Sequence, residues 1–185
     1  MIITVFGGSA PKPEEKAYSD ARQVGRLIAK RGHSVMTGGY IGTMEAVSRG
    51  ASEAGGHVIG VVCDEIEAWR DVRPNQWVEE EWRFPTLKER LNALIERCDI
   101  AFALPGGVGT MTEISLMWNQ LIIKAIPPRP LILIGSGWHT VFNQAFYTEL
   151  GDYVAQSQRD LLQFAPNIQS AVTLLEGSHI ERFES

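Results

Sequence analysis

Residues 100–113 read IAFALPGGVGTMTE, an apolar run that ends in a glycine-rich turn and continues into a segment of helical spacing. The run is apolar on both faces, which is typical of a central strand in a parallel sheet. Similar strands are predicted at Ile2–Phe6, His33–Met36, Val58–Val62 and Leu131–Ile134, beside Ile100–Leu104. Apolar residues at helical spacing predict helices over 17–28, 41–51, 87–95 and 167–175, with two more starting near residues 110 and 140. This alternation predicts one α/β domain over residues 1–185, a parallel sheet with helices on both faces.

Composition narrows the classes of protein that fit. The chain has 185 residues, 44% hydrophobic and 21% charged, with a net charge of −5. An acidic chain without a block of like charges is unsuited to gripping a nucleic acid polymer. No apolar run approaches the roughly 18 residues of a membrane span, and the first residues lack the features of a secretory signal. We therefore expect a cytoplasmic protein that binds neither polynucleotides nor membranes.

Metal-ligating residues are scattered. Cys63 and Cys98 belong to no CxxC motif, and the four histidines are singletons without the i, i+4 spacing of a zinc site. The cysteines are therefore expected to be small buried side chains. No protein-ligated metal is predicted.

Glycine-rich turns follow three of the predicted strands, at residues 7–9, 38–43 and 105–110. In an open parallel sheet, ligands bind at this carboxyl edge, where the strand order reverses. Glycine lets the backbone approach a ligand, and the next helix N-terminus favours an anion such as phosphate. No turn contains a Walker A ending or a full GxGxxG. The alternative is that each glycine serves only a tight turn.

Glu113 and Arg90 are the candidate chemical groups. The pattern around Glu113 predicts a helix that buries one face, with Glu113 on a neighbouring face; that buried face holds Met111, Ile114, Trp118, Leu121 and Ile122. Glu113 either polarises water or a sugar hydroxyl beside a phosphate loop, or it completes a T-x-x-E capping box with Thr110. Arg90 needs an acidic side chain or a bound anion, the ordinary alternative being a surface ion pair. Arg97 lies farther from the strand ends.

The segment from about 64 to 84 interrupts the α/β rhythm. It is dense in charge and holds three of the five tryptophans. An insertion of this kind is often a lid, a binding loop or a partner surface. The ordinary alternative is a loop with a short strand at the side of the sheet.

The run Leu104–Glu113 resembles the PGGxGTxxE signature of the LOG family, the cytokinin riboside 5′-monophosphate phosphoribohydrolases once labelled lysine decarboxylases. The resemblance extends in order over roughly residues 1–135, through 38–45, 55–61 and Arg90. It implies a Rossmann-like fold, a homodimer, and hydrolysis of the N-glycosidic bond of a nucleoside 5′-monophosphate to free base and ribose 5-phosphate. No cofactor or metal is implied.

The resemblance also assigns site residues. The family's catalytic glutamate corresponds to Glu113 and its catalytic arginine to Arg90. Its phosphate loop and the neighbouring turns correspond to Gly106, Gly107, Gly109 and Thr110, with Gly8, Ser9, Gly39 and Thr43.

Two departures from the family pattern stand out. The arginine lacks the family's preceding histidine and trailing lysine, so the identity of the base stays open: N6-modified AMP, as in cytokinin biosynthesis, or another nucleotide. The run 44–51 also resembles the related molybdenum-cofactor carrier proteins, which bind a phosphorylated pterin without catalysis. A non-catalytic nucleotide or cofactor carrier is therefore the alternative function. Lysine decarboxylase activity is a third hypothesis and weaker than these two, since no lysine lies at a glycine turn to hold a pyridoxal group.

Overall fold

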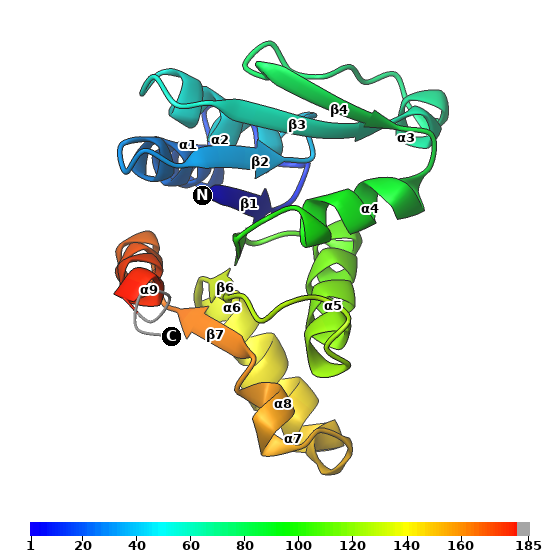
Figure 1. Cartoon of the computed structure of the whole chain (residues 1–185), viewed down its shortest axis with the longest axis vertical. Helices are drawn as coiled ribbons and strands as arrows, with labels where there is room; N and C mark the ends of the chain where they lie inside the picture. The colour runs from blue at the N-terminus through cyan, green and yellow to red at the C-terminus, as the bar shows by residue number, and fades with distance from the viewer. Residues whose placement is uncertain (181–185) are drawn as a thin grey trace.

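The computed structural model describes residues 1–180. Seven strands in this part of the chain form one parallel sheet in the order β4-β3-β2-β1-β5-β6-β7 (Figure 1). The strands are β1 Ile2–Phe6, β2 Ser34–Thr37, β3 Val58–Cys63, β4 Glu80–Phe84, β5 Ile100–Ala103, β6 Leu131–Ile134 and β7 Leu162–Ala165. The five predicted strands are confirmed within one residue at each end, and β4 and β7 are additional. The prediction of a parallel α/β sheet is confirmed.

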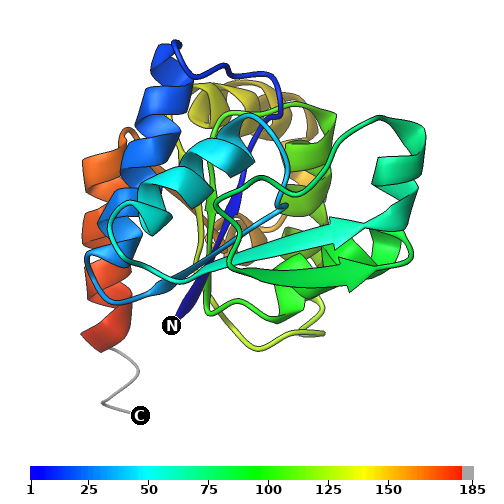
Figure 2. The same cartoon turned by 90° about the horizontal axis from the view of Figure 1, so that it is seen from above.

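Helices cover both faces of the sheet, as predicted (Figure 2). The longer ones are α1 Lys16–Ala29, α2 Thr43–Ser52, α4 Leu87–Glu96, α5 Val108–Ile122 and α9 Ile168–Ile180. The short ones are α3 Asp64–Trp69, α6 Ser136–His139, α7 Tyr147–Leu150 and α8 Gln156–Arg159, with a π-helix at Thr140–Phe146 and a 3₁₀ turn at Gly151–Tyr153. No helix within residues 1–180 combines the length and apolarity that a membrane span requires.

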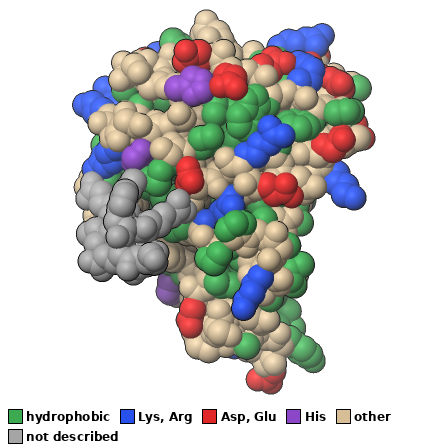
Figure 3. Space-filling model, viewed as in Figure 1, with side chains coloured by type: hydrophobic (Ala, Val, Ile, Leu, Met, Phe, Trp, Pro, Cys, Tyr) green, Lys and Arg blue, Asp and Glu red, His purple; other side chains and the backbone are tan. Residues whose placement is uncertain are grey.

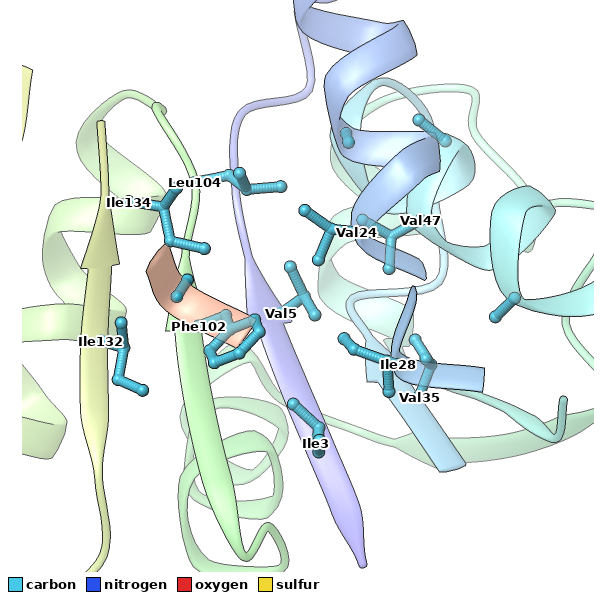
Figure 4. Packing of buried hydrophobic residues seen from close by; sticks show 14 of the residues in the cluster. Ile3, Val5, Val24, Ile28, Val35, Val47, Phe102, Leu104, Ile132 and Ile134 are labelled. Atoms are coloured by element: carbon cyan, nitrogen blue, oxygen red, sulfur yellow. The ribbon is translucent and has the colours of Figure 1, made fainter. Parts of the chain in front are cut away.

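Two buried apolar layers hold these helices to the sheet. On one face, α1, α2 and α9 pack on β1, β2, β5 and β6. Figure 4 shows Val24 and Ile28 of α1 pointing toward Val5 and Ile3 of β1. The opposite layer joins α4, α5 and α6 to the same sheet. Because both faces are covered, the central strands are apolar at nearly every position.

The segment after β6 extends past the edge of the sheet (Figure 1). The predicted helix near residue 140 is a π-helix between two short helices. Its Phe142 and Phe146 make edge-to-face contacts with Trp118 of α5, whose Nε1 donates a hydrogen bond of 2.7 Å to the Gln158 carbonyl. This aromatic cluster anchors the carboxyl half of α5.

The segment 64–84 contains a helix and a strand. Residues 64–69 form α3, and residues 80–84 form β4, an edge strand beside β3. The short-strand interpretation is therefore right for residues 80–84.

The charged side chains of the surface are mixed in sign. On the face drawn in Figure 3, acidic and basic side chains are interspersed rather than gathered by sign.

Candidate active site

The strand order reverses between β1 and β5, so the turns after these strands flank a crevice at the carboxyl edge of the sheet. A cavity of about 370 Å³ lies there. It is walled by the turn after β1, the residue Tyr40, helices α3 and α4, and the start of α5. It brings Arg90 and Glu113 together with Gly8, Ser9, Gly107, Gly109 and Thr110.

The three glycine turns are joined to one another by backbone hydrogen bonds and close packing. Gly8 N–H donates to the Pro105 carbonyl at 3.3 Å, and Thr43 N–H donates to the Gly8 carbonyl at 2.9 Å. A Cβ on Gly106 would collide with the Thr110 side chain and lie 2.8 Å from the Gly8 nitrogen. Glycine is required at 106 because three backbone segments meet there. The turns after β1, β2 and β5 thus form one packed unit.

The start of α5 is open to a ligand. Gly107 is the N-cap, and no atoms occupy the space where a Cβ would stand on Gly107 or Gly109. The first backbone N–H groups of a helix lack partners within the helix and carry partial positive charge. An anion fits this end of the cavity.

Three predicted phosphate-binding residues lie outside the cavity wall. Gly39 is in a left-handed turn (φ 76°) whose carbonyl accepts from Asn75 N–H at 2.8 Å. Thr43 is buried against Gly7, and Gly106 supports Gly8 and Thr110. Their observed contacts are with the turns, which they hold in shape.

Glu113 lies in the second turn of α5, with 9% of its surface exposed. The capping-box interpretation is wrong, because α5 begins at Val108 and Thr110 is already inside the helix. The predicted helix face was wrong in part: Thr110, Glu113 and Met117 are buried, whereas Met111 and Ile122 are only half-buried. Within the described part of the chain, the carboxyl accepts no hydrogen bond. Burial raises the pKa of Glu113 to about 7, and the nearby positive charge of Arg90 opposes that rise only in part.

Arg90 is held beneath the cavity by backbone carbonyls. The helix that carries it, α4, starts with the predicted capping box between Thr86 and Glu89. Its Nε donates to the Val61 carbonyl at 2.7 Å and its Nη2 to the Gly38 carbonyl at 3.1 Å. Only 5% of Arg90 is exposed, so the surface ion-pair interpretation is wrong. No carboxylate among residues 1–180 pairs with it within 4.0 Å, and its charge therefore remains available to a ligand.

Tyr40, which the sequence did not single out, supports Arg90. The guanidinium lies 5.6 Å from the centre of the Tyr40 ring. The hydroxyl accepts from Cys63 N–H at 2.9 Å and has the Cys63 carbonyl at 3.1 Å as an acceptor. Burial raises the pKa of this phenol, which therefore stays neutral. The fully buried Tyr40 ring, held by its hydroxyl on the Cys63 backbone, thus gives Arg90 a fixed cation–π partner.

The wall formed by α3 belongs to the segment 64–84, for which a binding loop was one interpretation, but no site residue was predicted there. Ile66, Trp69 and Arg70 line the cavity opposite the glycine turns. The density of tryptophan in 64–84 was the signal that could have located this wall.

Other features of the described chain lack this chemistry. A hollow of about 450 Å³ between α1 and α9 contains no buried carboxyl or arginine. Across residues 1–180, no three His, Cys, Asp or Glu side chains gather in a way that could hold a metal ion.

The structure is that of a Rossmann-like α/β protein with a crevice at the carboxyl edge of the sheet, lined by glycine turns and by the buried side chains of Glu113 and Arg90. Residues 1–126 match the SLOG cluster4 family, and the chain belongs to that family. The predicted LOG relationship is confirmed by relatives named cytokinin riboside 5′-monophosphate phosphoribohydrolase. The Oryza sativa enzyme is 31% identical over 180 residues, covering 94% of this chain and 72% of its own. The Mycobacterium marinum relative is 28% identical over 173 residues, which cover 92% of this chain and 90% of the relative.

Solved structures share the fold. The molybdenum cofactor binding protein from Rippkaea orientalis superposes with a TM-score of 0.73 at 24% identity, over 95% of both chains. The molybdenum cofactor carrier protein of Chlamydomonas reinhardtii gives 0.68 at 24% identity, over 95% and 96%. At this identity the likeness establishes the Rossmann-like architecture.

Proposed function

We propose that the chain hydrolyses the N-glycosidic bond of a nucleoside 5′-monophosphate, giving free base and ribose 5-phosphate. The observation that carries this proposal is a buried carboxyl without a hydrogen-bond partner, next to a buried arginine without a carboxylate, in one cavity. The names of the relatives support the same reaction class.

The proposed chemistry follows from the two groups. As the bond from C1′ to the base nitrogen breaks, its electron pair leaves with the base and positive charge develops on the ribose. The Glu113 carboxylate stabilises that charge and accepts a proton from the water that adds to C1′. This proton then passes to the departing base nitrogen, so the base leaves neutral and the carboxylate is restored. Arg90 offers donors to the departing base or to the phosphate. The N–H groups at the start of α5 hold the phosphate and orient the ribose.

The test compares wild type with Glu113→Gln and Glu96→Gln. Glu96 is an exposed glutamate at the end of α4 and provides the same chemical change outside the cavity. Free base is followed by chromatography with AMP, GMP, CMP, UMP, IMP and N6-isopentenyl AMP. We expect Glu113→Gln to bind nucleotide without turnover, while Glu96→Gln keeps the wild-type rate. An unchanged rate for Glu113→Gln would remove it from catalysis.

A carrier function is the alternative, and the shared fold with cofactor carriers favours it. It predicts that wild type releases no base from any nucleotide yet binds a nucleotide or pterin in the same cavity.

We also propose that the chain is a homodimer. Exposed apolar side chains support this proposal: 86% of Val108 and 39% of Val141 is exposed. Together with Met111 and Leu116, they line a hollow of about 710 Å³. A contiguous apolar surface of this kind favours a partner. Light scattering of the wild type is expected to give about twice the 20.5 kDa mass of the chain. The Val141→Asp variant is expected to give a mass closer to that of a single chain.

A further inference from the structure

Helix α3 adds an aromatic side chain and an unpaired cation to the cavity. Trp69, its last residue, is 79% exposed at the cavity wall. The next residue, Arg70, has its guanidinium 5.6 Å from the centre of the Trp69 ring. Its Nε is shielded from solvent and donates no hydrogen bond in the described chain. No protein acceptor therefore fixes this guanidinium, and Arg70 lines the cavity as a cation without a described hydrogen-bonding side-chain partner.

Arg70 differs from its neighbours in this respect. Arg73 and Arg83 belong to the same segment between β3 and α4, and both pair with Glu67, at 2.9 and 3.0 Å. Arg70 forms no such pair with a described carboxylate. The chain thus neutralises two arginines outside the cavity and leaves the cavity-lining one with free donors.

The position of α3 matches the base end of a bound nucleotide. The phosphate end is set by the start of α5, which follows β5, whereas α3 follows β3. β3 and β5 are separated by three strand spacings, about 14 Å across the sheet. With phosphate on the α5 turn and ribose beside Glu113, an extended nucleotide places its base against Ile66, Trp69 and Arg70.

We propose, on the basis of the proposed function, that Trp69 and Arg70 form the base-recognition wall and select 6-oxopurine nucleoside 5′-monophosphates, such as IMP and GMP. The O6 and N7 atoms of a 6-oxopurine are adjacent acceptors that match the donor fork of an arginine. Adenine presents an amino donor at the same place, and an N6 substituent adds bulk there. The indole holds the guanidinium in place and offers its remaining surface to the purine ring.

The experiment measures kcat/KM for IMP, GMP, AMP and N6-isopentenyl AMP with wild type, Arg70→Met, Arg70→Lys and Arg73→Met. Arg73 provides the matched control, because its side chain is 76% exposed and lies outside the cavity. Wild type and Arg73→Met are expected to favour IMP over AMP. Arg70→Met and Arg70→Lys are expected to lose that preference by about 5- to 150-fold, the range for one bidentate arginine–purine contact. Trp69→Ala should raise KM for both purines, and Trp69→Phe should restore it.

A second measurement separates this inference from the catalytic proposal. Calorimetric binding of IMP and AMP to Glu113→Gln, with and without Arg70→Met, reports base preference whether or not any nucleotide is cleaved. Tighter binding of IMP that disappears with Arg70→Met supports the base wall even if wild type releases no base. Equal binding of IMP and AMP, or a preference for N6-isopentenyl AMP, would overturn the proposed base wall. An equal loss of affinity for IMP and AMP in Arg70→Met would overturn it too, because it would assign Arg70 to the phosphate.

Discussion

The Arg90 side chain occupies the space that a side chain on Gly38 would need. Its Nη2 donates to the Gly38 carbonyl at 3.1 Å, and a Cβ built on Gly38 collides with that same nitrogen. The turn after β2 therefore acts on the site through the arginine that it supports. Glycine at this position keeps the guanidinium against the backbone.

Gly38→Ala is expected to displace Arg90 and lower kcat/KM at least 10-fold, with the domain still folded. The far end of an arginine side chain gives way more easily than backbone does, so the effect falls on activity more than on stability. Gly137→Ala is the control, because no atoms lie within 4 Å of its added Cβ. Rates and circular dichroism of both variants test this, and equal rates would contradict it.

Arg90→Lys is expected to reduce kcat/KM by about 100-fold or more, the usual cost of losing one well-placed donor to a transition state. A lysine ammonium cannot reproduce the fork that reaches the carbonyls of Val61 and Gly38 while presenting a further donor. Arg97→Lys, at the exposed end of α4, should keep the wild-type rate. Comparable losses in both variants would argue against a special role for Arg90.

The pH dependence of the reaction should report Glu113. Burial raises its pKa to about 7, and the proposed reaction needs the carboxylate. We therefore expect kcat/KM to rise with pH through an apparent pKa near 7 and to level off above it. A pH profile from 5 to 9 measures this, and a plateau that already extends below pH 6 would exclude a raised pKa in the free protein.

Stability should respond to the same group in the opposite direction. Because the folded-state pKa of Glu113 lies above its unfolded value, its favourable contribution is full below about pH 4.5 and is lost as the pH rises through about 7. The shift corresponds to about 3 kcal/mol. Relative to wild type, Glu113→Gln should thus gain free energy of unfolding at pH 8, by up to this amount, with a much smaller difference at pH 4. Urea unfolding at both pH values checks the sign, and a gain confined to pH 4 would reverse it.

Much of the fold was predictable because the central strands are buried on both faces. Two strands lie outside the five predicted ones, at opposite edges of the sheet: β7 was missed, and β4 was foreseen only as an alternative for the segment 64–84. Edge strands lack a neighbour on one side, and β4 is largely exposed with a charged sequence. Its hydrophobic pattern therefore resembles that of a loop.

The site was predictable where glycine turns follow buried strands, and less so where tertiary packing decides. Thr110–Glu113 has the spacing of a capping box, but Gly107 starts the helix earlier and turns Glu113 inward. Arg90 was recognised as a cation in need of an acidic side chain or an anion, yet its partners are carbonyls of β3 and of the turn after β2. Tyr40 and Arg70 carry no local signal, because their importance depends on which elements meet at the cavity.

The interlocked turns have an energetic consequence. Gly8, Pro105 and Thr43 are tied by backbone hydrogen bonds within the protein alone, so the end of the cavity proposed to hold the phosphate is expected to lose little conformational entropy on binding. A scaffold that is already ordered leaves more of the intrinsic binding free energy for aligning the reacting bond. Sequence change in α3 could then redirect the choice of ligand while this rigid end, and the chemistry beside it, stay as they are.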